Sequence, residues 1–115
     1  MAKDDYHVIV YQILSYLYYC LKKDIKVNGK NLSCEDSKYF DINKNYWSYI
    51  MINMFESGFI TGIEITPVWG EEYPVISNLE SCRITPKGIE YLCDNSFMEK
   101  AKQFLKDVKE ITPFI

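Results

Sequence analysis

Apolar and aromatic side chains fill most of residues 4–23, and their spacing predicts a helix. Polar side chains form only a narrow stripe, at Asp5, Gln12, Ser15 and Lys22. A helix with so little polar surface is covered on most of its sides. Either the domain wraps around this helix or a second copy of the chain does, and we favour a partial homodimer contact through residues 5–22.

The central stretch, residues 41–65, predicts a helix followed by a glycine stop and a strand. Asn43 or Asn45 is suited to cap the start of this helix, because a short side-chain acceptor satisfies free backbone N–H groups there. Gly58 suits the left-handed conformation that ends a helix. The buried face is expected to hold Tyr46, Trp47, Ile50, Met51, Met54 and Phe55.

The chain after Gly58 predicts a small β-structure. Phe59, Ile63 and Ile65 share one side of an extended segment, which suits a strand with one buried face. Residues 66–81 contain two prolines and a glycine and predict a loop or hairpin tip with strand ends in it. Residues 82–84 are the expected returning strand.

Three further helices are expected around this core. Residues 33–40 predict a short helix, with Ser33 as its cap and Asp36 three residues later, and with the central helix it would form a helix-turn-helix. Thr85 and Pro86 favour another helix start, because threonine caps and proline tolerates the first helical position. Residues 96–111 form the last helix, with an apolar face at Phe97, Met98, Ala101, Phe104, Leu105, Val108 and Ile111.

The segments 58–62 (GFITG), 84–92 (ITPKGIEYL) and the lysine-rich 98–111 resemble the YjcQ-like family of small phage and Gram-positive bacterial proteins. The resemblance covers roughly the last two thirds of the chain. It implies an α+β winged helix-turn-helix fold, mostly helical with a small antiparallel hairpin as the wing. The expected organisation is one winged-helix domain over residues 1–115, with an additional C-terminal helix at 96–111. The resemblance implies no enzymatic activity.

Charge changes the expectation for this fold, because most winged helices bind DNA through lysine and arginine contacts to phosphates. The 115 residues carry a net charge of −3, and the span from Asn45 to Cys82 contains no lysine or arginine. The glutamates of that span are Glu56, Glu64, Glu71, Glu72 and Glu80. The predicted helix and wing are therefore acidic or neutral.

The sequence is compatible with two functional hypotheses. At about 100° per residue, the outer face of the central helix carries Asn45, Ser48, Tyr49, Ile52, Asn53 and Glu56. The favoured hypothesis is a protein-interaction module of phage type, which contacts a protein partner or a second copy through Tyr49, Ile52, Glu56, Glu71 and Glu72. The alternative is a DNA-binding regulator that uses Lys44, Asn45, Ser48, Arg83, Lys102, Lys106 and Lys109. The outward apolar side chains could also be scattered surface residues, which are common.

The sequence gives little support to catalysis, cofactor binding or metal binding. Its four cysteines, Cys20, Cys34, Cys82 and Cys93, form no CxxC pair, and His7 is the only histidine. Zinc sites usually bring two close ligand pairs. No motif places a nucleophile beside a base, so we expect no catalytic residues and no cofactor. Without a signal peptide or a membrane-length apolar run, we expect reduced thiols, a cytoplasmic location and no membrane contact.

Overall fold

The computed structural model describes residues 1–109 as a mixed helical and β-structure. The α-helices are α1 (Tyr6–Lys23), α2 (Lys44–Glu56), α3 (Pro86–Asp94) and α4 (Ser96–Asp107). The strands are β1 (Ile60–Thr61), β2 (Glu64–Thr66), β3 (Val75–Ser77) and β4 (Arg83–Ile84). Short 3-10 helices occupy Gly29–Leu32 and Leu79–Ser81. The expected α+β class is confirmed at this level.

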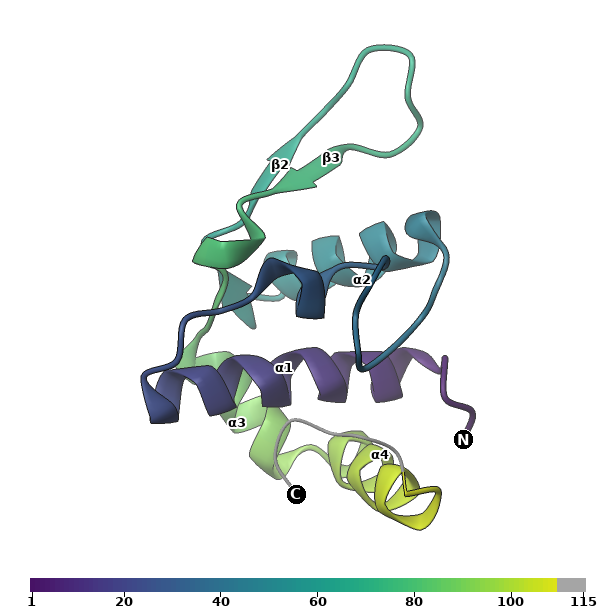
Figure 1. Ribbon diagram of the computed structural model, residues 1–115, viewed down its shortest axis with the longest axis vertical. Coiled ribbons are helices and arrows are strands. Elements are labelled where there is room, and N and C mark those ends of the chain that lie inside the picture. The colour runs from purple at the N-terminus through teal and green to yellow at the C-terminus, as the bar shows by residue number, and fades with distance from the viewer. Residues whose placement is uncertain (110–115) are drawn as a thin grey trace.

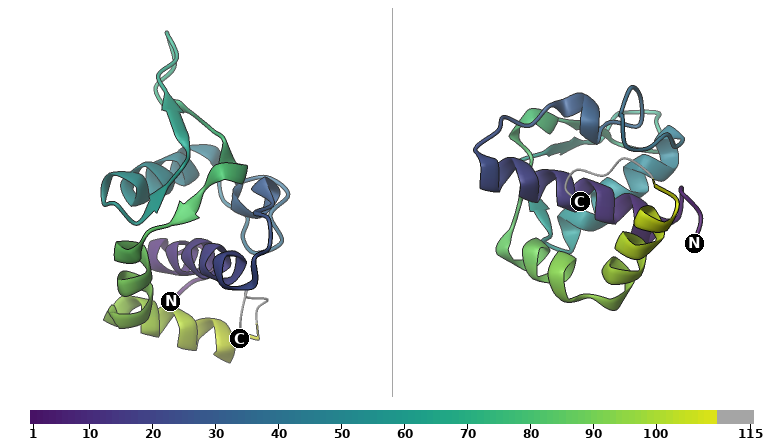
Figure 2. Two further views of the ribbon diagram at one scale, coloured as in Figure 1. Left: turned by 90° about the vertical axis from the view of Figure 1, so that its left-hand side faces the viewer. Right: turned by 60° about the horizontal axis from the view of Figure 1, so that its bottom comes forward.

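Helix α1 lies in the middle of the molecule, with α2 on one side and α3 and α4 on the other (Figures 1 and 2). Residues 8–17 of α1 and Cys20 are all buried by the chain itself. Of the two ways to cover this apolar helix, the structure thus uses the chain's own elements. These buried residues are unavailable to a homodimer contact, and a contact through the rest of residues 5–22 stays a prediction.

The polar stripe expected on α1 is partly inside the core, and the structure corrects that expectation. Gln12 and Ser15 are buried. The Nε2 of Gln12 donates a hydrogen bond of 2.8 Å to the backbone carbonyl of Tyr39, and the Ser15 hydroxyl donates to the carbonyl of Gln12 at 3.2 Å. These bonds offset the cost of removing polar atoms from water.

The short helix expected at 33–40 does not form, so a helix-turn-helix built on it is wrong. Residues 33–40 instead make bends, and Asp36 has a positive φ of 62°. The hydroxyls of Ser33 and Ser37 accept hydrogen bonds from the backbone N–H groups of Glu35 and Tyr39. Such local side-chain bonds compete with helical hydrogen bonds, which explains the difference.

Helix α2 begins and ends where its sequence signals predict. The Oδ1 of Asn43 accepts a hydrogen bond of 2.8 Å from the backbone N–H of Tyr46, and Gly58 has a φ of 79°. Four of its expected core side chains are buried, namely Trp47, Ile50, Met51 and Met54. Phe55, by contrast, is 38% exposed and does not belong to the buried face.

The expected strand after Gly58 is split into two strands that belong to different sheets. Strand β1 pairs antiparallel with β4, and β2 pairs antiparallel with β3. Gly62 separates β1 from β2 with a φ of 94°, and a Cβ there would collide with the carbonyl oxygen of Ser81. This break lets the β2–β3 hairpin project from the helical body (Figures 1 and 2).

Thr85 ties β1 to the start of α3. Its hydroxyl accepts a hydrogen bond of 3.0 Å from the backbone N–H of Gly88 and donates to the carbonyl of Gly58. Pro86 occupies the first turn, as expected. Helix α4 follows directly, capped by Asn95, and ends at Asp107 and not at residue 111. Ile111 and the apolar C-terminal residues lie outside the described residues.

Candidate interaction surface

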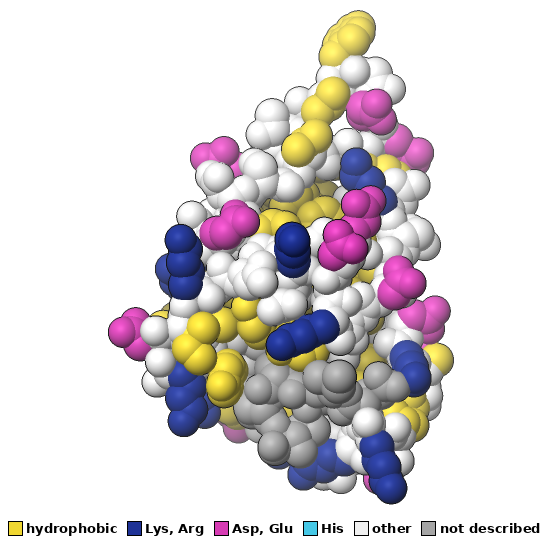
Figure 3. All heavy atoms as spheres, in the orientation of Figure 1, with side chains coloured by type: hydrophobic (Ala, Val, Ile, Leu, Met, Phe, Trp, Pro, Cys, Tyr) yellow, Lys and Arg dark blue, Asp and Glu magenta, His cyan; other side chains and the backbone are white. Residues whose placement is uncertain are grey.

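The β2–β3 hairpin ends in an apolar tip that the rest of the chain leaves uncovered. Three residue pairs join its strands, from Glu64–Ser77 to Thr66–Val75, and residues 67–74 connect them. Trp69 in this loop is fully exposed, at 101% of its reference area. Val68 and Val75 are also exposed. Hydrophobic side chains accordingly form the top of the molecule in Figure 3.

Acidic side chains lie beside this apolar tip. Glu64, Glu71 and Glu72 are exposed on the hairpin, and Figure 3 shows acidic side chains close to its top. The hairpin contains no lysine or arginine. An exposed tryptophan flanked by carboxylates combines a large apolar contact area with a negative field.

A groove of about 360 Å³ lies between the hairpin loop and the start of α2. Lys44 and Asn45 line it from the helix, and Glu71, Glu72 and Tyr73 line it from the loop. The groove thus brings together two residues expected for DNA contact and two expected for protein contact.

The remaining residues expected for protein contact lie elsewhere on α2. Tyr49 is 56% exposed, and its ring packs edge-on against Tyr6 of α1 with centroids 6.3 Å apart. Ile52 is half-buried and Glu56 is exposed. None of these three side chains lines the groove with Glu71 and Glu72. Of the five expected residues, Glu71 and Glu72 therefore line the groove and the other three lie outside it.

Ser48 was expected on the outer face of α2, and this expectation is wrong. Its side chain is buried, with 1% exposure. Successive positions of a helix lie 100° apart. The buried face of α2 is wide enough to include Ser48 as well as its neighbour Trp47. Ser48 is consequently unavailable to a base or a phosphate.

The basic residues proposed for the DNA alternative are dispersed. The Arg83 guanidinium donates to the backbone carbonyls of Glu80 and Cys82, at 3.3 and 2.9 Å. Lys102 and Lys106 lie on α4, and Lys109 follows that helix. Figure 1 shows α4 on the side of α1 opposite the hairpin. The structure therefore does not bring these lysines together with α2 and the hairpin.

Residues 11–111 match the model of the family described as YjcQ protein. The chain belongs to the YjcQ family. The match covers most of α1 as well as every later element, and is thus broader than the last two thirds of the chain. No curated protein and no solved structure gives a match.

Trp69 is the residue of this YjcQ family member that sequence reasoning missed. It lies between Pro67 and Gly70 in a segment expected to be a loop or hairpin tip. A tryptophan inside a proline- and glycine-rich turn was the available signal, because such a turn offers few neighbours to bury an indole.

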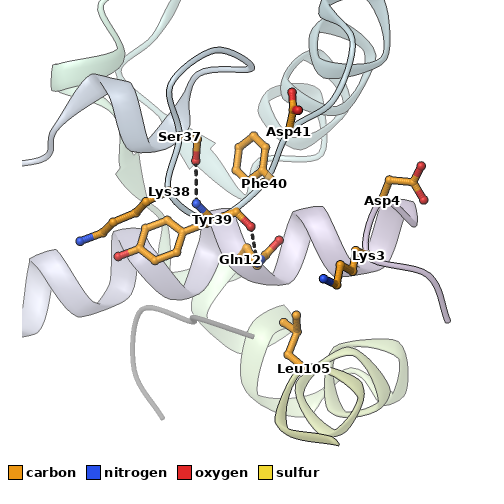
Figure 4. Close-up of a pocket in the computed structure, with 9 residues that line it drawn as sticks. All are labelled: Lys3, Asp4, Gln12, Ser37, Lys38, Tyr39, Phe40, Asp41 and Leu105. Atoms are coloured by element: carbon orange, nitrogen blue, oxygen red, sulfur yellow. Dashed lines mark hydrogen bonds between the residues drawn. The ribbon is translucent and has the colours of Figure 1, made fainter. Parts of the chain in front are cut away.

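A second cavity, of about 330 Å³, lies between α1, residues 37–41 and α4 (Figure 4). Gln12 and Leu105 line it from the two helices. Figure 4 shows the Gln12 amide directed at the Tyr39 carbonyl, and the buried Gln12 Oε1 has no hydrogen-bond partner among residues 1–109. The bond from Gln12 fastens the 37–41 segment to α1, which is a structural role.

The titratable side chains of residues 1–109 show no arrangement for metal chemistry. No group of three or more histidine, cysteine, aspartate or glutamate side chains is placed to hold a metal ion in this part of the chain. His7 stacks on the ring of Phe97 with centroids 4.4 Å apart. All four cysteines are free, and Cys20 and Cys82 are buried. Within the same residues, no helix has the length and apolar character needed to cross a membrane.

Proposed function

We propose that this member of the YjcQ family is a non-enzymatic recognition module that binds a protein partner through its β2–β3 hairpin. In this proposal the fold is a winged-helix variant, in which α2 takes the position of the recognition helix and the hairpin is the wing. The observation that carries the proposal is the fully exposed Trp69 at the hairpin tip.

An exposed tryptophan at the end of a projecting element is suited to be a binding anchor. Tryptophan is enriched among the residues that dominate interface energies, where its ring fills a pocket on the partner. A two-stranded hairpin holds such a ring away from the body, and Trp69 loses no intramolecular packing when it binds. The carboxylates of Glu71 and Glu72 add charge selectivity beside it.

DNA binding through α2 and the hairpin is the less supported function. Phosphate contacts supply most of the affinity of such proteins. Lys44 is the only lysine or arginine on α2 or the hairpin. With Ser48 buried, the polar surface offered to a base edge is also smaller than expected. We expect no binding to random duplex DNA in fluorescence anisotropy, even at low salt; salt-sensitive binding would favour the regulator function.

A non-enzymatic role is supported by the positions of the reactive groups. Cys20 and Cys82 are buried, and burial raises the pKa of the Cys82 thiol to about 12. A protonated, buried thiol is inert as a nucleophile. His7 contacts the ring of Phe97, on the side of α1 away from the hairpin.

Capture experiments with matched baits test the proposal. The unchanged chain, a Trp69→Ser variant and a Phe97→Ser variant are immobilised and exposed to a lysate of the organism that encodes the chain. Phe97 is the control, because it is also an exposed aromatic residue, at 45%, but lies on α4. We expect the unchanged chain and the Phe97→Ser variant to capture the same protein, and the Trp69→Ser variant to capture none of it.

A second bait tests the charge component. The Glu71→Lys, Glu72→Lys double variant should also lose the captured protein while its circular dichroism spectrum stays unchanged, because both side chains are exposed. Equal capture by the Trp69→Ser bait would reject the hairpin as the recognition element.

A further inference from the structure

A pocket of about 430 Å³ with a mixed apolar and polar lining lies at the C-terminal end of α1. Cys20 and Val27 are buried residues that line it, and Leu21 and Ile25 form a more exposed part of its lining, at 50% and 45%. Isolated exposed apolar side chains are ordinary, but here two of them border one pocket. The pocket therefore offers these apolar side chains to another molecule within a mixed lining.

Basic side chains border this pocket. Lys26 and Arg83 line it, against one carboxylate, Asp24. Lys22 and Lys23 lie in the adjacent last turn of α1. Figure 3 shows hydrophobic side chains at the left-hand end of α1 with lysine and arginine side chains beside them. The pocket thus combines apolar side chains with two basic side chains and one carboxylate.

We propose that this pocket receives the Trp69 hairpin tip of a second copy of the chain. The two surfaces are complementary in chemistry. An indole followed by Glu71 and Glu72 meets a pocket that holds apolar side chains together with Lys26 and Arg83. This inference rests on the proposed function of the hairpin and names its partner.

The contact joins two molecules, because the tip and the pocket lie at different ends of one chain. The hairpin tip forms the top of the molecule in Figure 1, whereas the pocket lies at the end of α1. A contact between two different surfaces is heterologous, so each molecule has one tip and one pocket to offer. The contact is also small and should be weak, with association visible between about 10 µM and about 1 mM.

Two variants with complementary defects test the proposal. Trp69→Ala lacks the tip, and Leu21→Asp with Ile25→Asp blocks the pocket; the changed side chains are exposed, so the fold is expected to persist. In sedimentation velocity, the mass of the unchanged chain should rise with concentration. Each variant alone should associate about thirtyfold more weakly, the effect of losing a dominant interface residue.

An equimolar mixture of the two variants gives the decisive result. The mixture retains one intact tip and one intact pocket, so it should form a 1:1 complex at concentrations where neither variant alone associates detectably. A Phe97→Ala chain, altered at an exposed aromatic residue on α4, should associate like the unchanged chain. A mixture that stays monomeric, or an unchanged chain that is monomeric throughout, overturns the proposal.

Charge exchange provides a second and independent readout. Glu71→Lys with Glu72→Lys should abolish self-association, and mixing with a Lys26→Glu, Arg83→Glu variant should restore it at low salt. Failure of this restoration would count against the proposed pairing of surfaces. A monomeric chain that still captures another protein in a Trp69-dependent way would reject self-association and leave the proposed function standing.

Discussion

Burial divides the four cysteines into protected and accessible thiols. Cys82, the residue before β4, is fully buried, and desolvation raises its pKa to about 12. Cys20 is buried as well, Cys34 is half-buried and Cys93 is exposed on α3. Because the thiolate is the reactive form, a raised pKa and poor access both suppress the chemistry of Cys82.

We therefore expect one fast-reacting thiol in the folded protein. With a thiol reagent at about pH 8, Cys93 should be modified first and Cys34 more slowly, while Cys20 and Cys82 react only after unfolding in urea. Mass spectrometry of tryptic peptides identifies the order. Modification of Cys82 at the rate of Cys93 would mean that β4 opens readily, which contradicts the packing described here.

The hydroxyl of Thr85 makes two hydrogen bonds at the junction of β1, β4 and α3, whereas the Asn43 side chain caps α2 with one. We expect Thr85→Ala to lower the free energy of unfolding by about 2 kcal/mol and Asn43→Ala by about 1 kcal/mol. Urea unfolding measures both values. Thr85→Ser keeps the hydroxyl and should recover most of the loss; an equally unstable serine variant would assign the effect to the methyl group.

At the scale of the element, we expect that the hairpin loop can be shortened without destabilising the core. Residues 67–74 lie beyond the last strand pair, Thr66–Val75, and Trp69 contributes no buried surface. Replacing residues 67–74 by Asn-Gly should give a two-residue hairpin turn and leave the melting temperature almost unchanged. The shortened chain should bind no partner. A large loss of stability would show that the loop packs on the body.

The helices and their boundaries were largely predictable because their signals are local. Asn43, Gly58 and Thr85 each act on backbone groups within a few residues, and the structure confirms all three roles. The helix expected at 33–40 failed because its serines bond to neighbouring N–H groups and hold bends. The division of the strand at Gly62 depends on a close approach to Ser81, a distant contact that local patterns do not reveal.

At the scale of the whole molecule, burial depends on how the elements are assembled. The apolar pattern predicted that α1 is covered, but not that α2, α3, α4 and β4 of the same chain cover it. Glu71 and Glu72 were predicted as surface residues and line the groove beside α2. Trp69 was missed because its exposure arises from the projection of the hairpin beyond the core, which lengthens the molecule to 43 Å.

The assembly also separates the charges that a DNA-binding protein would combine. The hairpin carries only acidic charge, and the lysines of α4 lie on the other side of α1. This separation, with an apolar residue at the extreme end of the molecule, favours recognition of a protein surface.

Acrylamide quenching of Trp69 fluorescence tests this account most directly. A Trp47→Phe variant leaves Trp69 as the only tryptophan, since the chain has two. Trp47 is buried and donates to the Leu32 carbonyl at 2.7 Å, so this variant is first checked for folding. We expect Trp69 to be fully quenched in dilute protein and shielded once a partner or a second copy is bound. Shielding at every dilution, or full quenching within a complex, would contradict the hairpin as the recognition element.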